Sequence, residues 1–306
     1  MPKLPNFLII GAGKSGTTSI YEYLSQHPEV FMSPVKETNF FALEGKEVKA
    51  RDNSPEQTEH YPWAINNFTD YQGLFEEAGN AKAIGEASPM YLYNKDAPVR
   101  IKERLPRVKL IAILRQPVDR LYSRYMHLMR EGREPGKQFA DALDEQSIWW
   151  RRNDLVKEGF YGTYLKRYYG LFNNDQIKVL LYDELKSNPE KVMLELYEYI
   201  GVEPTFKPDF STEFNKSGRI KNRFVNQLIG QNSIVTKTLQ STSPTLLKYI
   251  KGQRHLKAII TKWRNKNLQK GTLSPVLKQE MTQSIYHEEI GLLETLMQRD
   301  LSQWLT

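Results

Sequence analysis

The stretch that decides the fold is NFLIIGAGKSGTTSIYEYL, residues 6–24. It begins with a short apolar run, 6–10, which is typical of a buried parallel strand. A glycine-rich loop follows, and the pattern of 17–26 then predicts a helix. Glycines let a backbone turn its N–H groups toward an anion, and a helix N-terminus adds a partial positive charge. The stretch therefore predicts an anion-binding loop between a strand and a helix.

The position of one lysine bears on which anion this loop holds. An ATP-binding loop reads Gly, four residues, Gly, Lys and then Ser or Thr. Gly11 and Gly16 have that spacing, but Thr17 stands where the lysine belongs, and Lys14 lies inside the loop. The anion therefore need not be a nucleoside triphosphate. The residues that we expect to contact it are Lys14, Ser15, Gly16, Thr17 and Thr18.

Strand and helix patterns alternate along most of the chain. Further strands are expected at 30–33, 81–89, 108–115 and 176–185, and further helices at 117–132, 188–201 and 274–305. This alternation predicts a parallel sheet with helices on both faces. We expect a single three-layer α/β domain over 1–306, with an irregular insertion at 44–70 and an atypical segment at 220–270.

Composition narrows the class of protein. The 306 residues include no cysteine, which excludes disulfides, thiolate metal sites and cysteine nucleophiles, and which fits a reducing compartment. The N-terminus lacks the apolar core of a signal peptide, and no run approaches the roughly 20 apolar residues of a membrane span. We therefore expect a cytoplasmic protein without a membrane span. We also expect no nucleic-acid partner.

The net charge of +7 is unevenly distributed. From Lys216 to Lys270 there are 13 Lys and Arg residues and no Asp or Glu. One interpretation is a set of solvated helix faces. The other is a surface for an anionic ligand, a polyanion or a membrane. In this second interpretation, the segment 220–270 can also cover the acceptor. The sequence leaves both interpretations open.

A second motif, LIAILRQPVDRLYSRYMH, occupies residues 110–127. Arg115 follows a predicted buried strand, which is where α/β sheets place ligand-binding residues. Ser123 lies eight residues later, in the predicted helix. A guanidinium fork and a hydroxyl that fold toward one edge of the sheet can bind one phosphate together.

These two motifs together resemble those of sulfotransferases that use 3′-phosphoadenosine 5′-phosphosulfate (PAPS), above all the heparan sulfate type and its bacterial relatives. The family fold is P-loop-like, which agrees with the predicted three-layer domain. The resemblance extends through SPVKETNFF (33–41), GEASPMYL (85–92), VLLYDEL (179–185), NKSGR (215–219) and the closing LMQRDLSQWL.

The resemblance implies a role for each donor-binding residue. The first loop would bind the 5′-phosphosulfate, and Lys14 would neutralise the bridging oxygen as its bond to sulfur breaks. Arg115 and Ser123 would bind the 3′-phosphate. The loop that closes over the 3′-phosphate and the adenine would contain Ser217, Gly218 and Arg219.

The acceptor must lose a proton, so a base is needed within hydrogen-bond reach. None of the five histidines lies in a loop that obviously faces the donor. The family commonly has a Lys-Glu-Pro-His-Phe-Phe motif with the Glu as base, which implies Glu37 here. Thr38 and Asn39 replace the Pro and the His, so the acceptor contacts stay open. Further candidates for acceptor contacts are Glu86, Ser88, Tyr91, Trp149 and Trp150, although core packing is the expectation for the two tryptophans.

The resemblance implies transfer of the sulfuryl group from PAPS to a hydroxyl or amine of a small metabolite or glycoconjugate. The product nucleotide would be adenosine 3′,5′-bisphosphate. Such transfer depends on positioning and charge stabilisation and demands no metal. Two alternatives remain: a Mg-ATP-dependent kinase in which Asp183, at the end of a strand, holds magnesium, and a protein that binds polyanions through 216–270.

Overall fold

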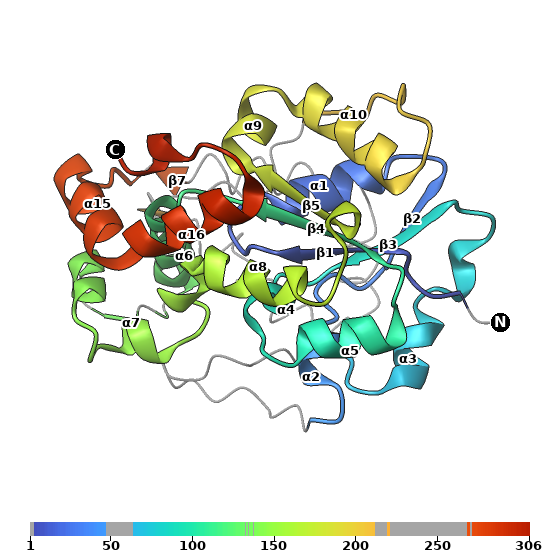
Figure 1. The fold of residues 1–306 in the computed structure, drawn as a ribbon, viewed down its shortest axis with the longest axis horizontal. Helices are drawn as coiled ribbons and strands as arrows, with labels where there is room; N and C mark the ends of the chain where they lie inside the picture. The colour runs from blue at the N-terminus through green and yellow to red at the C-terminus, as the bar shows by residue number, and fades with distance from the viewer. Residues whose placement is uncertain are drawn as a thin grey trace, which may run out of the picture.

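A parallel sheet lies at the centre of the chain (Figure 1). The computed structural model describes residues 3–46, 64–131, 133, 135–136, 138–211, 219–220, 268–269 and 271–306. The five strands run in the order β2-β3-β1-β4-β5, and every neighbouring pair is parallel. Their bounds are β1 Phe7–Gly11, β2 Val30–Met32, β3 Ala83–Ala87, β4 Lys109–Leu114 and β5 Ile177–Leu181. The prediction of a central parallel sheet is confirmed.

The strand order explains where a ligand can bind. The chain runs from β1 to β2 and β3 on one side of β1, and then returns to β4 on the other side. In open α/β sheets, ligands bind outside the carboxyl ends of the strands at such a reversal. Lys14 follows β1, Arg115 follows β4 and Glu37 follows β2, so all three lie at this edge.

Helices cover both faces of the sheet, as Figure 1 shows. One face carries α1 (Thr17–Leu24), α9 (Tyr182–Ser187) and α10 (Pro189–Ile200). The other carries α4 (Met90–Tyr93), α5 (Ala97–Arg104) and α8 (Tyr161–Tyr169), and α16 (His287–Met297) packs against α8. Strand β1 is buried on both sides, because Phe7 and Ile9 face the first layer while Leu8 and Ile10 face the second. This burial is the reason for its continuous apolar sequence.

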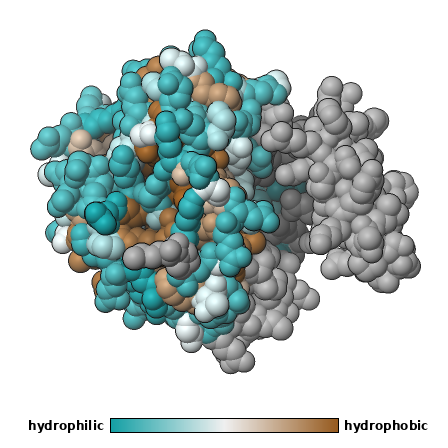
Figure 2. Space-filling model, turned by 90° about the vertical axis from the view of Figure 1, so that its right-hand side faces the viewer, coloured by the Kyte–Doolittle hydropathy of each residue, from teal (hydrophilic) through white to brown (hydrophobic). Residues whose placement is uncertain are grey.

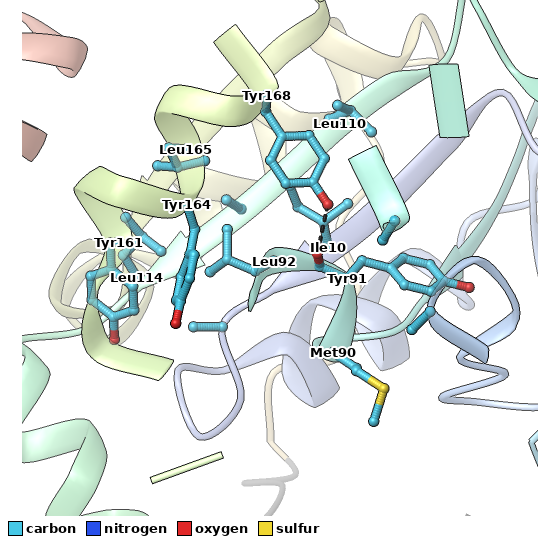
Figure 3. Packing of buried hydrophobic residues seen from close by; sticks show 14 of the residues in the cluster. Ile10, Met90, Tyr91, Leu92, Leu110, Leu114, Tyr161, Tyr164, Leu165 and Tyr168 are labelled. Atoms are coloured by element: carbon cyan, nitrogen blue, oxygen red, sulfur yellow. Dashed lines mark hydrogen bonds between the residues drawn. The ribbon is translucent and has the colours of Figure 1, made fainter. Parts of the chain in front are cut away.

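Tyrosines of α8 form much of the second layer. Figure 3 shows Tyr161, Tyr164, Leu165 and Tyr168 of this helix packed over the sheet and α4. The hydroxyl of Tyr168 donates a 2.7 Å hydrogen bond to the backbone carbonyl of Tyr91, so the buried oxygen atom is satisfied.

The remaining helices contribute buried residues to the second layer. They are α2 (Phe40–Leu43), α3 (Phe68–Gly73), α6 (Pro117–Glu131), α7 (Ile148–Arg151) and α15 (Pro275–Met281). The side chain of Asn188 accepts a hydrogen bond from the backbone N–H of Lys191 and caps α10. The predicted strand 176–185 was too long, because β5 ends at Leu181. Asp183 and Glu184 lie instead in the first turn of α9, where carboxylates stabilise a helix N-terminus.

The C-terminal stretch is helical but not continuous. A π-helical turn, Thr282–Tyr286, separates α15 from α16, and Gln298 ends α16 with a φ of 50°. The amide of Gln116 donates to the Thr282 hydroxyl (2.8 Å) and to the carbonyl of Trp304 (3.2 Å). These bonds tie the C-terminal segment to the residue that follows Arg115.

The face at the amino ends of the strands is mostly hydrophilic, with apolar residues showing near its middle (Figure 2). Within the part of the chain that the structure describes, no helix has both the length and the apolar character that crossing a bilayer requires. Most of the expected insertion at 44–70 and of the basic segment 220–270 lies outside the described residues. In the latter, only β6 (Arg219–Ile220) and β7 (Leu268–Gln269) are described, as an antiparallel pair.

Candidate functional site

The glycine-rich loop folds between β1 and α1 as predicted. Its start is fixed to the sheet, since the N–H of Ala12 donates to the carbonyl of Ile113 in β4 (2.8 Å). Lys14 and Gly16 both have left-handed backbone conformations, with φ of 66° and 101°. Gly16 caps α1, and the first N–H groups of any helix lack partners within that helix. The loop therefore presents a lysine and a helix N-terminus at the edge where ligands bind.

Arg115 lies beside this loop. Its guanidinium group stacks over the ring of Tyr182, 4.8 Å from the ring centroid. The same ring lies against Gly16, where an added Cβ would be 3.2 Å from Cδ2 of Tyr182. Tyr182 is therefore a shared neighbour of the loop and of Arg115, and the two predicted anion-binding elements are adjacent in space.

Helix α6 reaches the loop from another side. Ser123 is nearly buried, and Arg120 and His127 lie about one turn before and after it. Burial lowers the pKa of His127, and the positive charge of Lys14 lowers it further, so this imidazole is neutral near pH 7. Lys14 is thus close enough to His127 to affect its titration, which places the loop beside α6. From the sequence, no histidine lies in a loop that obviously faces the donor, and His127 indeed belongs to a helix, α6.

A buried ion pair, between residues that no sequence motif marks, connects α6 to the loop. Nη1 of Arg120 lies 2.8 Å from Oε2 of Glu158, and both side chains are at most 5% exposed. Oε1 of Glu158 accepts a 2.7 Å hydrogen bond from the N–H of Gly13. Burial raises the pKa of Glu158 to about 7, although the positive charges of Arg120 and Arg124 oppose the rise.

A second charged cluster fixes the segment that carries Glu158. Asp154 accepts hydrogen bonds from Arg124 of α6 and from Arg152. Burial alone would raise the pKa of Asp154, but the two guanidinium groups outweigh it and hold this pKa well below its ordinary value. The Asp154 carboxylate is therefore ionised, and it anchors the segment to α6.

Glu37 lies in the loop after β2, next to the carboxyl end of β3. Its backbone is left-handed, with a φ of 60°, and its N–H donates to the carbonyl of Ala87 (2.9 Å). The side chain is 34% exposed and pairs with Lys36 at 2.8 Å. Because β3 separates β2 from β1, Glu37 and Lys14 follow strands on either side of β3. A partly exposed carboxylate at this position can take a proton from a bound molecule.

Glu86 is the centre of a buried network behind Glu37. Its carboxylate accepts hydrogen bonds from four hydroxyl groups at 2.6–3.2 Å, those of Thr38, Tyr71, Ser88 and Tyr91. The Ser88 hydroxyl also accepts the N–H of Asn39, which has a φ of 52°. The network holds the backbone on the C-terminal side of Glu37. The hypothesis that Glu86, Ser88 and Tyr91 face the acceptor is wrong, because all three are fully buried and hydrogen-bonded to one another.

The titration of Glu86 can be measured through stability. Burial raises the pKa of Glu86 above its ordinary value of 4.5, so the folded state binds more protons than the unfolded state above pH 4.5. The free energy of unfolding of the wild type, minus that of Glu86→Gln, should therefore fall as pH rises from 4.5. Urea denaturation at a series of pH values measures this difference. A difference that grows with pH would contradict the account, since it would mean a lowered pKa.

The structure describes only some of the remaining predicted site residues. Ser217 and Gly218 lie outside the described residues. Arg219 is in β6, which lies beside α6, the helix that carries Ser123. Trp149 is buried and packs near Tyr125 and Phe139, so core packing is confirmed for it.

The structure places Asp183 in α9, not on the strand that the magnesium hypothesis requires. Among the described residues, no group of three or more His, Asp or Glu side chains is arranged to hold a metal ion. The prediction that the strand ends in Asp183 is therefore wrong, because β5 ends at Leu181.

Comparisons with known proteins agree with this architecture. A sequence model of the Sulfotransferase family matches residues 5–207. Bifunctional heparan sulfate N-deacetylase/N-sulfotransferase 2 of Bos taurus is 30% identical over 216 residues, which cover 66% of this chain and 22% of that protein. Membrane-associated sulfotransferase kil1 of Dictyostelium discoideum is 35% identical over 122 residues, which cover 40% of this chain and 22% of that protein. The match thus spans about a fifth of these relatives.

A solved structure extends the likeness to the whole fold. The sulfotransferase from Alicyclobacillus acidocaldarius superposes with a TM-score of 0.69 at 27% identity, over 99% of this chain and 100% of that one. The family match includes the glycine-rich loop, β4 and most of the helices that surround them. The chain belongs to the sulfotransferase family.

Proposed function

We propose that the chain transfers the sulfuryl group of PAPS to a hydroxyl or amine of an acceptor. The observation that carries the proposal is the adjacency of two anion-binding elements, since Tyr182 lies against both Gly16 and Arg115. PAPS bears a phosphosulfate on one side of its ribose and a phosphate on the other. It therefore needs two neighbouring anion sites at one edge of a sheet.

In this proposal each element binds one end of the donor. The loop N–H groups, with Ser15 and the hydroxyls of Thr17 and Thr18, hold the 5′-phosphosulfate at the N-terminus of α1. Arg115 and Ser123 hold the 3′-phosphate, as a guanidinium fork and a hydroxyl donor. The glycine-rich loop and its cation fit such an anion, because close backbone approach is possible there.

Two residues act in the chemical step. Glu37 takes the proton from the acceptor hydroxyl or amine, whose freed electron pair forms the new bond to sulfur. Lys14 stabilises the negative charge that develops on the bridging oxygen as the old sulfur–oxygen bond breaks. The products are the sulfated acceptor, protonated Glu37 and adenosine 3′,5′-bisphosphate.

The 3′-phosphate assignment can be tested with one variant. Arg115→Ala should weaken binding of adenosine 3′,5′-bisphosphate about tenfold or more, the usual loss for a hydrogen bond to a charged group. Binding of adenosine 5′-monophosphate, which lacks the 3′-phosphate, should change less than about twofold if that group alone engages Arg115. Calorimetry without magnesium measures both, with the exposed Arg107→Ala as the control. Equal weakening of the two nucleotides would remove Arg115 from the 3′-phosphate site.

The reaction itself is tested with PAPS that carries radiolabelled sulfate. The labelled donor is offered to a panel of glycans, amines and alcohols in the presence of a metal chelator. The name of the relative from Bos taurus, a heparan sulfate N-sulfotransferase, favours sugar amines in this panel. We expect labelled product without magnesium; phosphoryl transfer from Mg-ATP, with no transfer of label, would support the kinase instead.

Four further statements stay predictions from the sequence. They are a cytoplasmic location, independence from metals, a small metabolite or glycoconjugate as acceptor, and a single domain over 1–306.

A further inference from the structure

The N–H of Gly13, in the glycine-rich loop, is hydrogen-bonded to a side chain from a distant part of the sequence. It donates to Oε1 of Glu158 at 2.7 Å, across 145 positions of the sequence. The contact is close, because a Cβ at position 13 would lie 2.6 Å from the same oxygen. Only glycine fits here without displacement of the carboxylate. Glu158 therefore contacts the backbone directly at the residue before Lys14.

The second carboxyl oxygen of Glu158 is also hydrogen-bonded. Oε2 accepts a 2.8 Å hydrogen bond from Nη1 of Arg120, whose side chain is fully buried. The guanidinium also donates to the backbone carbonyls of Asp154 and Leu155. Arg120 belongs to α6, one turn before Ser123. A continuous set of polar contacts therefore runs from the helix of the 3′-phosphate element, through Arg120 and Glu158, to the loop of the 5′-phosphosulfate.

We infer that Glu158 is a positioning residue that holds the donor loop, through the N–H of Gly13, in the conformation that directs Lys14 and the following N–H groups toward the 5′ end of the donor. This inference rests on the proposed function, because it assumes that the loop binds that end. Lys14 has a φ of 66°, a backbone conformation that residues other than glycine adopt at a cost in conformational energy. Such a conformation persists when neighbouring contacts fix it. The bond from Gly13 to Glu158 is one such contact, and the 2.8 Å bond from Arg120 keeps the carboxyl group in place.

A single substitution at Glu158 cannot test this role cleanly, because it would leave Arg120 as a buried charge without its partner. Two double variants avoid the problem. Arg120→Met with Glu158→Gln, the amide variant, removes the ion pair but keeps a side-chain oxygen that can accept the N–H of Gly13. Arg120→Met with Glu158→Leu, the apolar variant, removes the ion pair and the acceptor together. Both lose the same bonds to the carbonyls of Asp154 and Leu155, so they form a matched pair.

The readout separates the two ends of the donor. Calorimetry gives Kd for adenosine 3′-monophosphate and for adenosine 3′,5′-bisphosphate. The Kd of the 3′-monophosphate divided by that of the bisphosphate measures how much the 5′-phosphate contributes to binding. The amide variant should keep this ratio within about twofold of the wild type, and the apolar variant should lower it about tenfold, the usual size of a charged hydrogen-bond effect. Binding of the 3′-monophosphate should be alike in all three proteins. Melting temperatures confirm that both variants are folded.

Two outcomes would overturn the inference. Equal ratios in the two variants would mean that the acceptor for Gly13 is irrelevant to the loop. Equal weakening of both nucleotides would mean that Glu158 only supports the fold. Failure of the proposed function looks different, because wild-type protein would then bind the bisphosphate no more tightly than the 3′-monophosphate.

Discussion

Glu37→Gln should lower kcat by about 10²–10⁴-fold, the usual contribution of a general base. The amide has the size of the carboxylate but cannot take the acceptor proton. The backbone at this position is held by the bond from its N–H to the carbonyl of Ala87, and the substitution leaves that bond in place. Binding of PAPS should change little, because the donor does not contact the carboxylate in our account. Steady-state rates with an acceptor from the labelled-donor screen, and calorimetry with the product nucleotide, measure the two effects.

Exposed Glu77→Gln is the control for the loss of one negative charge, and it should keep wild-type turnover. If Glu37→Gln also turned over at a rate close to the wild type, the base would have to be another group.

Lys14→Ala should lower kcat/KM by about 10²–10³-fold, as for removal of one donor to a developing oxyanion. It should weaken binding of adenosine 3′,5′-bisphosphate much less. The charge on the bridging oxygen is greatest as the bond to sulfur breaks, so Lys14 should stabilise the transition state more than the bound product. Alanine and lysine both carry a Cβ, so the strain of the left-handed backbone is the same in both proteins.

Equal losses in kcat/KM and in nucleotide affinity would contradict the role of Lys14 in the transition state. The lysine would then contribute only to binding, and its effect on the donor would resemble that expected for Arg115. Melting temperatures of the unliganded proteins serve as the control for folding in this comparison.

The parts of the site that could be predicted are those that the sequence encodes locally. The loop between β1 and α1 is one continuous stretch, and Arg115 and Ser123 belong to one strand–helix unit with fixed spacing. Strand burial and helix capping depend on neighbouring residues, so their patterns are visible in the sequence. The resemblance to a family could therefore be recognised from short motifs.

The parts that could not be predicted depend on contacts between distant segments. Glu158 reaches Gly13 and Arg120 only after the chain has folded, and no spacing in the sequence marks the three residues as neighbours. The same is true of Glu86, which contacts Thr38 from 48 positions away. A motif match alone suggested that Glu86 faced the acceptor, whereas its burial makes it a support for the loop that carries Glu37.

The melting temperature of the wild type with different nucleotides tests the central claim most directly, because it needs no acceptor. A ligand at a hundred times its Kd stabilises the folded state by about 2.7 kcal/mol, which corresponds to a shift of several degrees for a chain of this length. Our account predicts that adenosine 3′,5′-bisphosphate raises the melting temperature clearly in the absence of magnesium, and that ATP at the same concentration has little effect with or without magnesium. Stabilisation by Mg-ATP, with no effect of the bisphosphate, would contradict the assignment of a PAPS site.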